Sequence, residues 1–360
     1  MKLIMIVAAY LCIFEVASLA FWELYGAKRI PYHERVDASS ADFVHQGSAW
    51  RDHLSAPDIE LGWLPNTEHE WIEDDGSRSA PMVPVRQRIS AYGDSFVFGA
   101  DVKNEEAFPH QLSLLVGSRV QNFGVGSYGP DQAVLFLERH LRNGERPEIV
   151  ILGMPSENIA RVVNMIRRFY IPQEGVQFYK PLFVAKGKEW RLVGGLPKWP
   201  PEAWGWDQLL SAAREHDIWY AQNGSRPRFE FPYSLTTLQA AWFLSFGVLR
   251  WQELYQDERA VATMRYLLDR FAGLSKEFGF LPVFVIVPMP EDLLELRSGK
   301  NAFFSAFLRE ASREHRDDLI VVDVLDVEFD MERFHVRPFS GHASAYGNQI
   351  IAQAIYSRLL

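Results

Sequence analysis

The chain has 360 residues, of which 48% are hydrophobic and 23% charged, a composition typical of a globular protein with a large core. Its net charge of −9 provides no basic field for a phosphate backbone, so we expect no nucleic-acid partner. The single cysteine, Cys12, excludes an internal disulfide and a cysteine-rich metal site, and the length predicts one large domain or one and a half.

Residues 1–25 hold an apolar run, Leu3 to Trp22, that only Glu15 interrupts. This length predicts a signal peptide or a membrane-spanning helix, with a buried N-terminal helix as a third alternative. A small-x-small cleavage site, Ser18-Leu19-Ala20, is present, but the run continues past it. We therefore favour an uncleaved anchor in the inner membrane with a periplasmic or otherwise extracytoplasmic body, over secretion. A charged Glu15 in the middle of such a span would make its insertion into the membrane less favourable in free energy.

Residues 26–86 show little periodicity and predict a linker followed by an irregular arm. Two stretches within them are turn-like, "LGWLPN" at 61–66 and "DDGSR" at 74–78.

From residue 87 the pattern changes to short apolar runs that alternate with helical segments. The runs are rich in β-branched residues, as buried parallel strands are. Five strands alternating with helices predict a three-layer α/β/α, doubly wound parallel sheet of the flavodoxin-like kind. The expected strands are 88–92, 119–123, 148–152, 283–287 and 319–323, and the expected helices are 107–117, 130–142, 258–278, 301–315 and 345–360.

About 130 residues separate the third and fourth expected strands, far more than a crossover needs. We expect most of them, about 165–255, to form a large insertion that caps the ligand edge of the sheet. Its tryptophans would suit stacking on sugar rings, or would form the small core of the insertion. They are Trp190, Trp199, Trp204 and Trp206.

Polar residues follow the expected strands, at the sheet edge where ligands of such folds bind. Ser95 follows the first strand and is either a nucleophile or a helix cap. The glycine-rich stretch "NFGVGSYGPDQ" at 122–132 follows the second and forms either an oxyanion hole or a tight turn. Asn158 after the third offers an amide donor or is structural, and His342 before the last helix is a base or a surface residue. Their combination in this order favours an acyl-transfer site.

These residues resemble the four blocks of the SGNH/GDSL hydrolase superfamily over about residues 86–360. The resemblance implies Ser95 as nucleophile and His342 as base. It implies an oxyanion hole from the amides of Ser95 and Ser127 and the Asn158 side chain. Position 127 usually holds glycine in the family; the serine amide can still donate, or neighbouring Gly126 can replace it.

The expected acid is missing. The family places Asp two or three residues before the His, where this chain has Phe339 and Ser340. Either Ser95 and His342 act as a dyad, with Ser340 or a backbone carbonyl orienting the ring, or a carboxylate reaches back from the fifth strand. The candidates for that carboxylate are Asp323, Asp326 and Asp330.

The stretch "LGWLPN" at 61–66, well upstream of "GDSF" at 93–96, and the stretch "SENIARVVN" at 156–164 resemble a membrane-anchored or periplasmic branch of the superfamily that acts on acylated surface polysaccharides. The leading expectation is a serine esterase that removes an acyl group, most plausibly acetyl, from a carbohydrate or a small ester. The alternatives are an O-acyltransferase with the same site and a non-catalytic carbohydrate-binding or scaffold protein. We expect no cofactor and no metal, because the ten histidines show no HExxH or paired short-spacing pattern.

Overall fold

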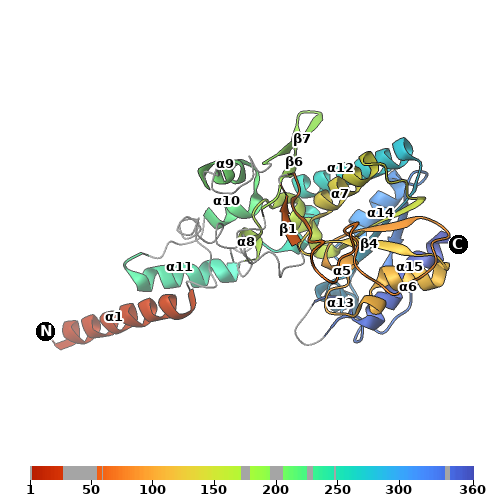
Figure 1. The fold of residues 1–360 in the computed structure, drawn as a ribbon. Coiled ribbons are helices and arrows are strands. Elements are labelled where there is room, and N and C mark those ends of the chain that lie inside the picture. The colour runs from red at the N-terminus through yellow and green to blue at the C-terminus, as the bar shows by residue number, and fades with distance from the viewer. Residues whose placement is uncertain are drawn as a thin grey trace. The chain divides into compact units, whose positions relative to one another are not determined.

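The computed structural model describes residues 2–26, 55–58, 60–171, 179–194, 206–224, 230–246, 249–336 and 341–360 (Figure 1). The chain forms two compact units. We call Gly47–Val163, Lys180–Pro197 and Trp251–Leu360 the sheet unit. The helical unit comprises Met1–Gln46, Asn164–Tyr179 and Lys198–Arg250.

A five-stranded parallel sheet forms the centre of the sheet unit. Its order is β4-β3-β5-β8-β9, so the second strand along the chain lies outside the first and the later strands follow on the other side. This confirms the predicted fold class. The strand order switches direction at β3, because β4 lies on one side of it and β5 on the other. In such sheets the ligand crevice lies at the carboxyl ends of the strands, beside this switch point. The strands are β3 (Ile89–Gly93), β4 (Val120–Gly124), β5 (Ile149–Pro155), β8 (Leu281–Val287) and β9 (Ile320–Asp323).

Helices cover both faces of this sheet (Figure 1), which is why its strands are apolar almost throughout. On one face α6 packs against α15, and the alternating β3 residues Ile89 and Ala91 point into that layer. On the other face α7 packs against α12, and Tyr92 stacks on Phe123 there. The helices are α6 (Phe108–Val116), α7 (Pro130–Arg142), α12 (Glu258–Phe278), α14 (Ser305–Glu314) and α15 (Ala345–Leu359).

The sheet unit also contains shorter elements that the sequence pattern did not reveal. Two antiparallel hairpins, β1 (Ser55–Asp58) with β2 (Gly62–Pro65) and β6 (Leu182–Lys186) with β7 (Glu189–Val193), lie where an irregular arm and the insertion were expected. The other elements are α5 (Ser95–Phe98), α13 (Pro290–Arg297) and the 3-10 helices Asn104–Glu106, Ser156–Val163, Trp251–Gln256 and Val324–Asp326.

The arm before β3 is tied to the glycine-rich loop after β4. The Trp63 indole donates to the carbonyl of Gly126 at 3.0 Å, and the Gln132 amide donates to the carbonyl of Leu61 at 2.6 Å. The Tyr128 hydroxyl donates to the carbonyl of Trp63. These three bonds fix the loop that follows β4 at the ligand edge of the sheet.

The helical unit gathers α-helices from three parts of the chain. Buried Asp217 ties two of them together by accepting from the amides of Met165 and Ile166 at 2.6 and 3.2 Å. Among the described residues, one stretch, Met5–Leu24, is a helix long and apolar enough to cross a membrane. The elements are α1 (Lys2–Phe21), a π-helical turn (Trp22–Gly26), α8 (Arg167–Tyr170), α9 (Trp206–His216), α10 (Ile218–Gly224) and α11 (Tyr233–Phe246).

The four tryptophans expected to contact sugars have different surroundings. Trp190 in β7 stacks on Tyr266, with ring centroids 4.5 Å apart, and so lies on the sheet unit. Trp199 and Trp204 are outside the described residues, and only the backbone of Trp206 is described, at the start of α9.

Candidate active site

The turn from β3 into α5 places Ser95 at the carboxyl edge of the sheet. The Asp94 carboxylate accepts from the amide of Phe96 at 2.9 Å and so begins the helix. A Cβ on Gly93 would lie 2.3 Å from the carbonyl oxygen of Gly153, and one on Gly124 would lie 2.1 Å from the amide of Phe98. Glycine is therefore required at both strand ends, because only it lets α5 pack this closely on the sheet.

Ser95, His342 and Asp101 form a continuous chain of hydrogen bonds. The Ser95 Oγ lies 2.8 Å from Nε2 of His342, and the Nδ1 of the same ring lies 2.7 Å from Oδ2 of Asp101. The loop that carries His342 is fixed by a bridge between His335 and Ala343. A hydroxyl, an imidazole and a carboxylate in this order are the parts of an activated serine nucleophile.

The carboxylate at Nδ1 corrects the expected position of the acid. It belongs to Asp101, six residues after Ser95, and not to the residues that follow β9. Asp323 instead caps its own 3-10 helix by accepting from the amide of Leu325 at 2.9 Å, and Asp330 accepts from the amide of Glu332 at 2.9 Å. Asp326 ends that 3-10 helix. Ser340 and Phe339 lie outside the described residues.

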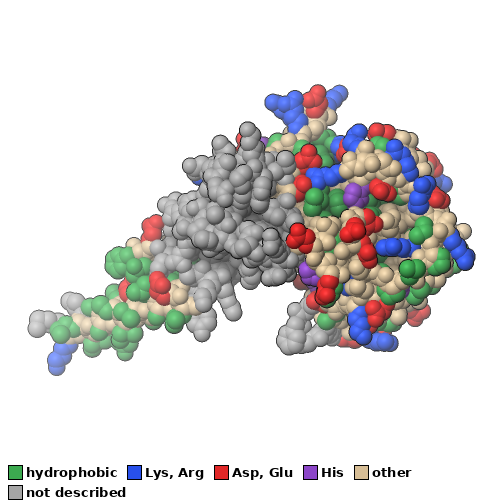
Figure 2. Space-filling model, in the orientation of Figure 1, with side chains coloured by type: hydrophobic (Ala, Val, Ile, Leu, Met, Phe, Trp, Pro, Cys, Tyr) green, Lys and Arg blue, Asp and Glu red, His purple; other side chains and the backbone are tan. Residues whose placement is uncertain are grey.

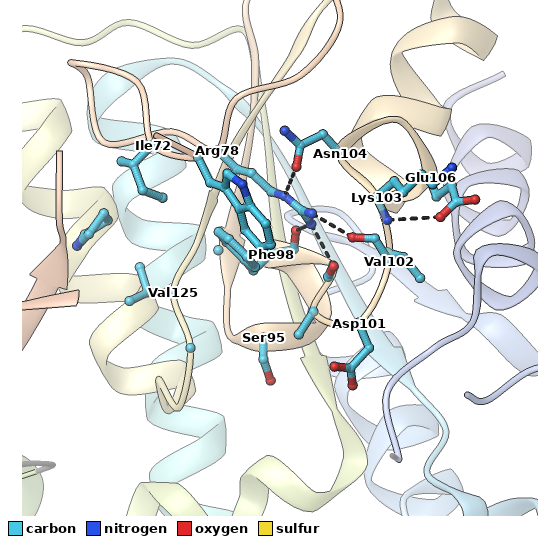
Figure 3. A pocket seen from close by; sticks show the side chains of 16 residues that line it. Ile72, Arg78, Ser95, Phe98, Asp101, Val102, Lys103, Asn104, Glu106 and Val125 are labelled. Carbon is cyan, nitrogen blue, oxygen red and sulfur yellow. Dashed lines mark hydrogen bonds between the residues drawn. The ribbon is translucent and has the colours of Figure 1, made fainter. Parts of the chain in front are cut away.

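Arg78 holds the loop that presents Asp101 (Figure 3). Its guanidinium donates to the carbonyls of Phe98, Gly99 and Val102, the last two at 2.7 and 2.8 Å, and its carbon lies 4.4 Å from the centre of the Phe98 ring. Burial lowers the pKa of Arg78 to about 10, which leaves it charged at neutral pH. Asp101 has a φ of 66°, a left-handed conformation that a free loop rarely adopts. Arg78 thus stabilises the conformation in which Asp101 reaches His342.

A buried ion pair joins the loops after β3, β4 and β5. Arg161 Nη1 lies 3.0 Å from Oδ2 of Asp94 and donates to the carbonyl of Tyr128 at 2.8 Å. Asp94 is fully buried, and its burial raises the pKa of the carboxyl. The nearby charge of Arg161 lowers this pKa, but by less than burial raises it. The pair aligns Ser95 with the second and third loops.

Two further residues expected in the site lie beside this pair. Ser127 has a φ of 65°, a left-handed conformation that costs a serine about 1 kcal/mol and that glycine adopts readily. Asn158 is buried, and its side-chain nitrogen lies 3.5 Å from the carbonyl of Tyr128. The Asn158 side chain also contributes to lowering the pKa of the Asp94 carboxyl, against the larger effect of burial. The carbonyl of Gly126 is held by Trp63.

A cavity of about 800 Å³ opens beside Ser95. Its wall is mostly apolar and combines the N-terminal arm, the α5 loop and the loop after β4 (Figure 3). The lining includes Pro65, Trp71, Ile72, Phe98 and Val125. Trp71 is 44% exposed, so its ring is accessible to a ligand.

Sequence patterns missed three residues of this site: Arg78, Asp101 and Arg161. Asp101 and Arg78 lie in loops, where the sequence has no strand or helix periodicity. No local sequence pattern therefore identifies them. Arg161 follows Asn158 by one helical turn in "SENIAR", and a buried 3-10 helix there would have suggested an inward-pointing arginine.

No protein-family model and no curated protein matches this sequence. Solved structures with a similar fold include a lipolytic protein of the G-D-S-L family from Desulfitobacterium hafniense. It is 12% identical, with a TM-score of 0.40, over 76% of this chain and 99% of that one. The lipase Lip_vut3 from a goat rumen metagenome is 10% identical, with a TM-score of 0.41, over 76% and 97%. A catalytic mutant of Axe2, an acetylxylan esterase from Geobacillus stearothermophilus, is 13% identical, with a TM-score of 0.36, over 77% and 95%.

Proposed function

We propose that this protein is a serine esterase of the SGNH type that works through an acyl-enzyme. The observation that carries the proposal is the hydrogen-bonded chain from Ser95 through His342 to Asp101, at distances of 2.8 and 2.7 Å. It lies at the carboxyl edge of the sheet, beside a cavity that can hold a substrate.

In the first half-reaction His342 Nε2 takes the Ser95 proton while Oγ attacks the ester carbonyl. The amides of Ser95 and Ser127 and the Asn158 side chain stabilise the oxyanion. Asp101 stabilises the imidazolium, which then gives its proton to the leaving alcohol. Water attacks the acyl-enzyme in the same way, releases the carboxylic acid and restores Ser95.

The substrate we propose is an acylated carbohydrate of the cell envelope, with acetyl as the acyl group. The exposed ring of Trp71 at the cavity suits stacking on a sugar, and the apolar wall suits the sugar's C–H face. We place the sheet unit outside the cytoplasm, with α1 as its membrane anchor. The length and apolar character of Met5–Leu24 support the anchor.

The function is tested by hydrolysis of p-nitrophenyl acetate. We expect the wild type to hydrolyse it and both Ser95→Ala and His342→Ala to lose at least about 10³-fold in kcat. Ser298→Ala, at an exposed hydroxyl on another loop, should retain full activity. Equal rates in Ser95→Ala and the wild type would overturn the proposal. Labelled acyl groups on an added oligosaccharide would instead identify an O-acyltransferase with the same nucleophile.

A further inference from the structure

One face of α1 is covered and the rest of the helix is exposed. The covered side chains follow the spacing i, i+3 and i+7: Glu15 is half-buried, Ser18 is 3% exposed and Trp22 is 1% exposed. Figure 2 shows hydrophobic side chains along the remainder of the helix that Figure 1 labels α1. The exposed ones include Ile6, Tyr10, Leu11, Ile13 and Val16.

The segment that covers this face of α1 is α11. The two helices are in contact, and the two buried side chains described on α11 are small and four residues apart: Thr236 is 5% exposed and Ala240 is 4% exposed. The Trp22 indole donates to Oγ1 of Thr237 at 2.9 Å. Small and hydroxyl-bearing side chains at the contact are typical of helices that associate inside a lipid bilayer.

The first residues of α11 donate hydrogen bonds to the carboxylate of Glu15. Its carboxylate accepts from the amides of Tyr233 and Ser234 at 2.7 and 3.2 Å, and from the Ser234 hydroxyl. These amides have no partner within their own helix, and the N-terminus of a helix favours a negative charge. The one charged side chain in the apolar run is thus paired with a segment more than 200 residues away in sequence.

The outer face of α11 is apolar and exposed. Leu235, Leu238 and Trp242 are 51, 57 and 70% exposed, and Phe231 just before the helix is 75% exposed. Tyr233–Phe246 contains no Asp, Glu, Lys or Arg. Exposed apolar side chains that lie together in this way, on α11 and on α1, mark a surface that contacts a membrane or another protein.

We propose that α11 enters the lipid bilayer beside α1 as a second membrane-embedded helix. Its 14 residues extend about 21 Å, less than the roughly 30 Å of a hydrocarbon core, so it is inserted without spanning. The bilayer covers Leu235, Leu238 and Trp242, and the α11 amides satisfy Glu15 within the apolar layer. This inference uses the membrane location of α1 but is independent of whether Ser95 is catalytic.

Lipid accessibility of position 238 in the full chain tests the proposal. A nitrobenzoxadiazole label is placed on Leu238→Cys in a Cys12→Ser background, in vesicles of phosphatidylethanolamine and phosphatidylglycerol. The matched control is Leu294→Cys on α13, which is 61% exposed on the sheet unit. Native Cys12, which is exposed on α1, serves as the membrane reference.

We expect the label at 238 to be quenched by doxyl lipids, like that at Cys12, and the label at 294 to be quenched by aqueous iodide. Adding Glu15→Leu should remove most of the lipid quenching at 238 while α1 stays embedded, because the cap of α11 is lost. Iodide quenching at 238 equal to that at 294 would overturn the proposal. Ester hydrolysis in the labelled proteins reports separately on the proposed function.

Discussion

At the scale of single residues, the candidate site contains a carboxylate, that of Asp101, which no local sequence pattern marks. Ser95 and His342 stand in recognisable stretches, and their order along a doubly wound sheet predicts that they meet. Asp101 stands in no such stretch, and its contact with His342 requires a left-handed backbone in the loop after α5. The carboxylates expected near His342 follow the fifth strand, whereas the observed one comes from the loop after α5.

Asp101→Asn should lower kcat by about 10²- to 10⁴-fold with little change in KM, because the amide cannot stabilise the imidazolium that forms during attack. Asp323→Asn is the matched control: it weakens only a cap of a short helix and should leave kcat unchanged. Steady-state kinetics on p-nitrophenyl acetate measures kcat and KM of both variants and of the wild type. If Asp101→Asn keeps the wild-type kcat, Asp101 does not assist His342.

At the scale of elements, the strands and helices of the central sheet were predictable, whereas the short elements and the helices of the insertion, α9 and α11, were not. The expected strand 148–152 is observed as Ile149–Pro155, and the expected helix 258–278 as Glu258–Phe278. Their apolar periodicity extends over enough residues to identify them. In contrast, α5 has four residues, and the hairpins at 55–65 and 182–193 depend on contacts distant in sequence.

The packing of α7 on the sheet predicts a pH dependence of stability. His140 at the end of α7 lies among Tyr92, Phe123 and Phe136, and its Nδ1 is 2.8 Å from the Tyr92 hydroxyl. Burial lowers the pKa of His140 from 6.5 to about 4. In the unfolded chain His140 is therefore protonated below about pH 6.5, whereas in the folded chain it is protonated only below about pH 4.

The wild type should accordingly lose about 2 kcal/mol of unfolding free energy from this group between pH 7.5 and 5.0. His140→Gln keeps an acceptor for Tyr92 and cannot be protonated in this range. Urea unfolding at the two pH values measures the free energy of unfolding of both proteins. Its decrease between pH 7.5 and 5.0 should be about 2 kcal/mol smaller in His140→Gln than in the wild type. An identical loss in both proteins would mean that His140 does not contribute.

At the scale of the whole molecule, the two units have different chemical character. The sheet unit carries Ser95, His342 and Asp101 beside a cavity, and the helical unit carries α1 and α11 with their exposed apolar side chains. The length of the chain predicted one large domain or one and a half, and no sequence pattern predicted the pairing of α1 with α11. It depends on Glu15 meeting a helix start whose position only the fold determines.

Reaction with a fluorophosphonate probe shows whether Ser95 is an activated nucleophile, as its hydrogen bond to His342 predicts. The probe forms a phosphorus–oxygen bond with an activated serine and releases fluoride. Peptide mass spectrometry should locate the adduct on the peptide that contains Ser95, and labelling should be lost in Ser95→Ala and strongly reduced in His342→Ala. Folded wild-type protein that leaves Ser95 unmodified would contradict the account.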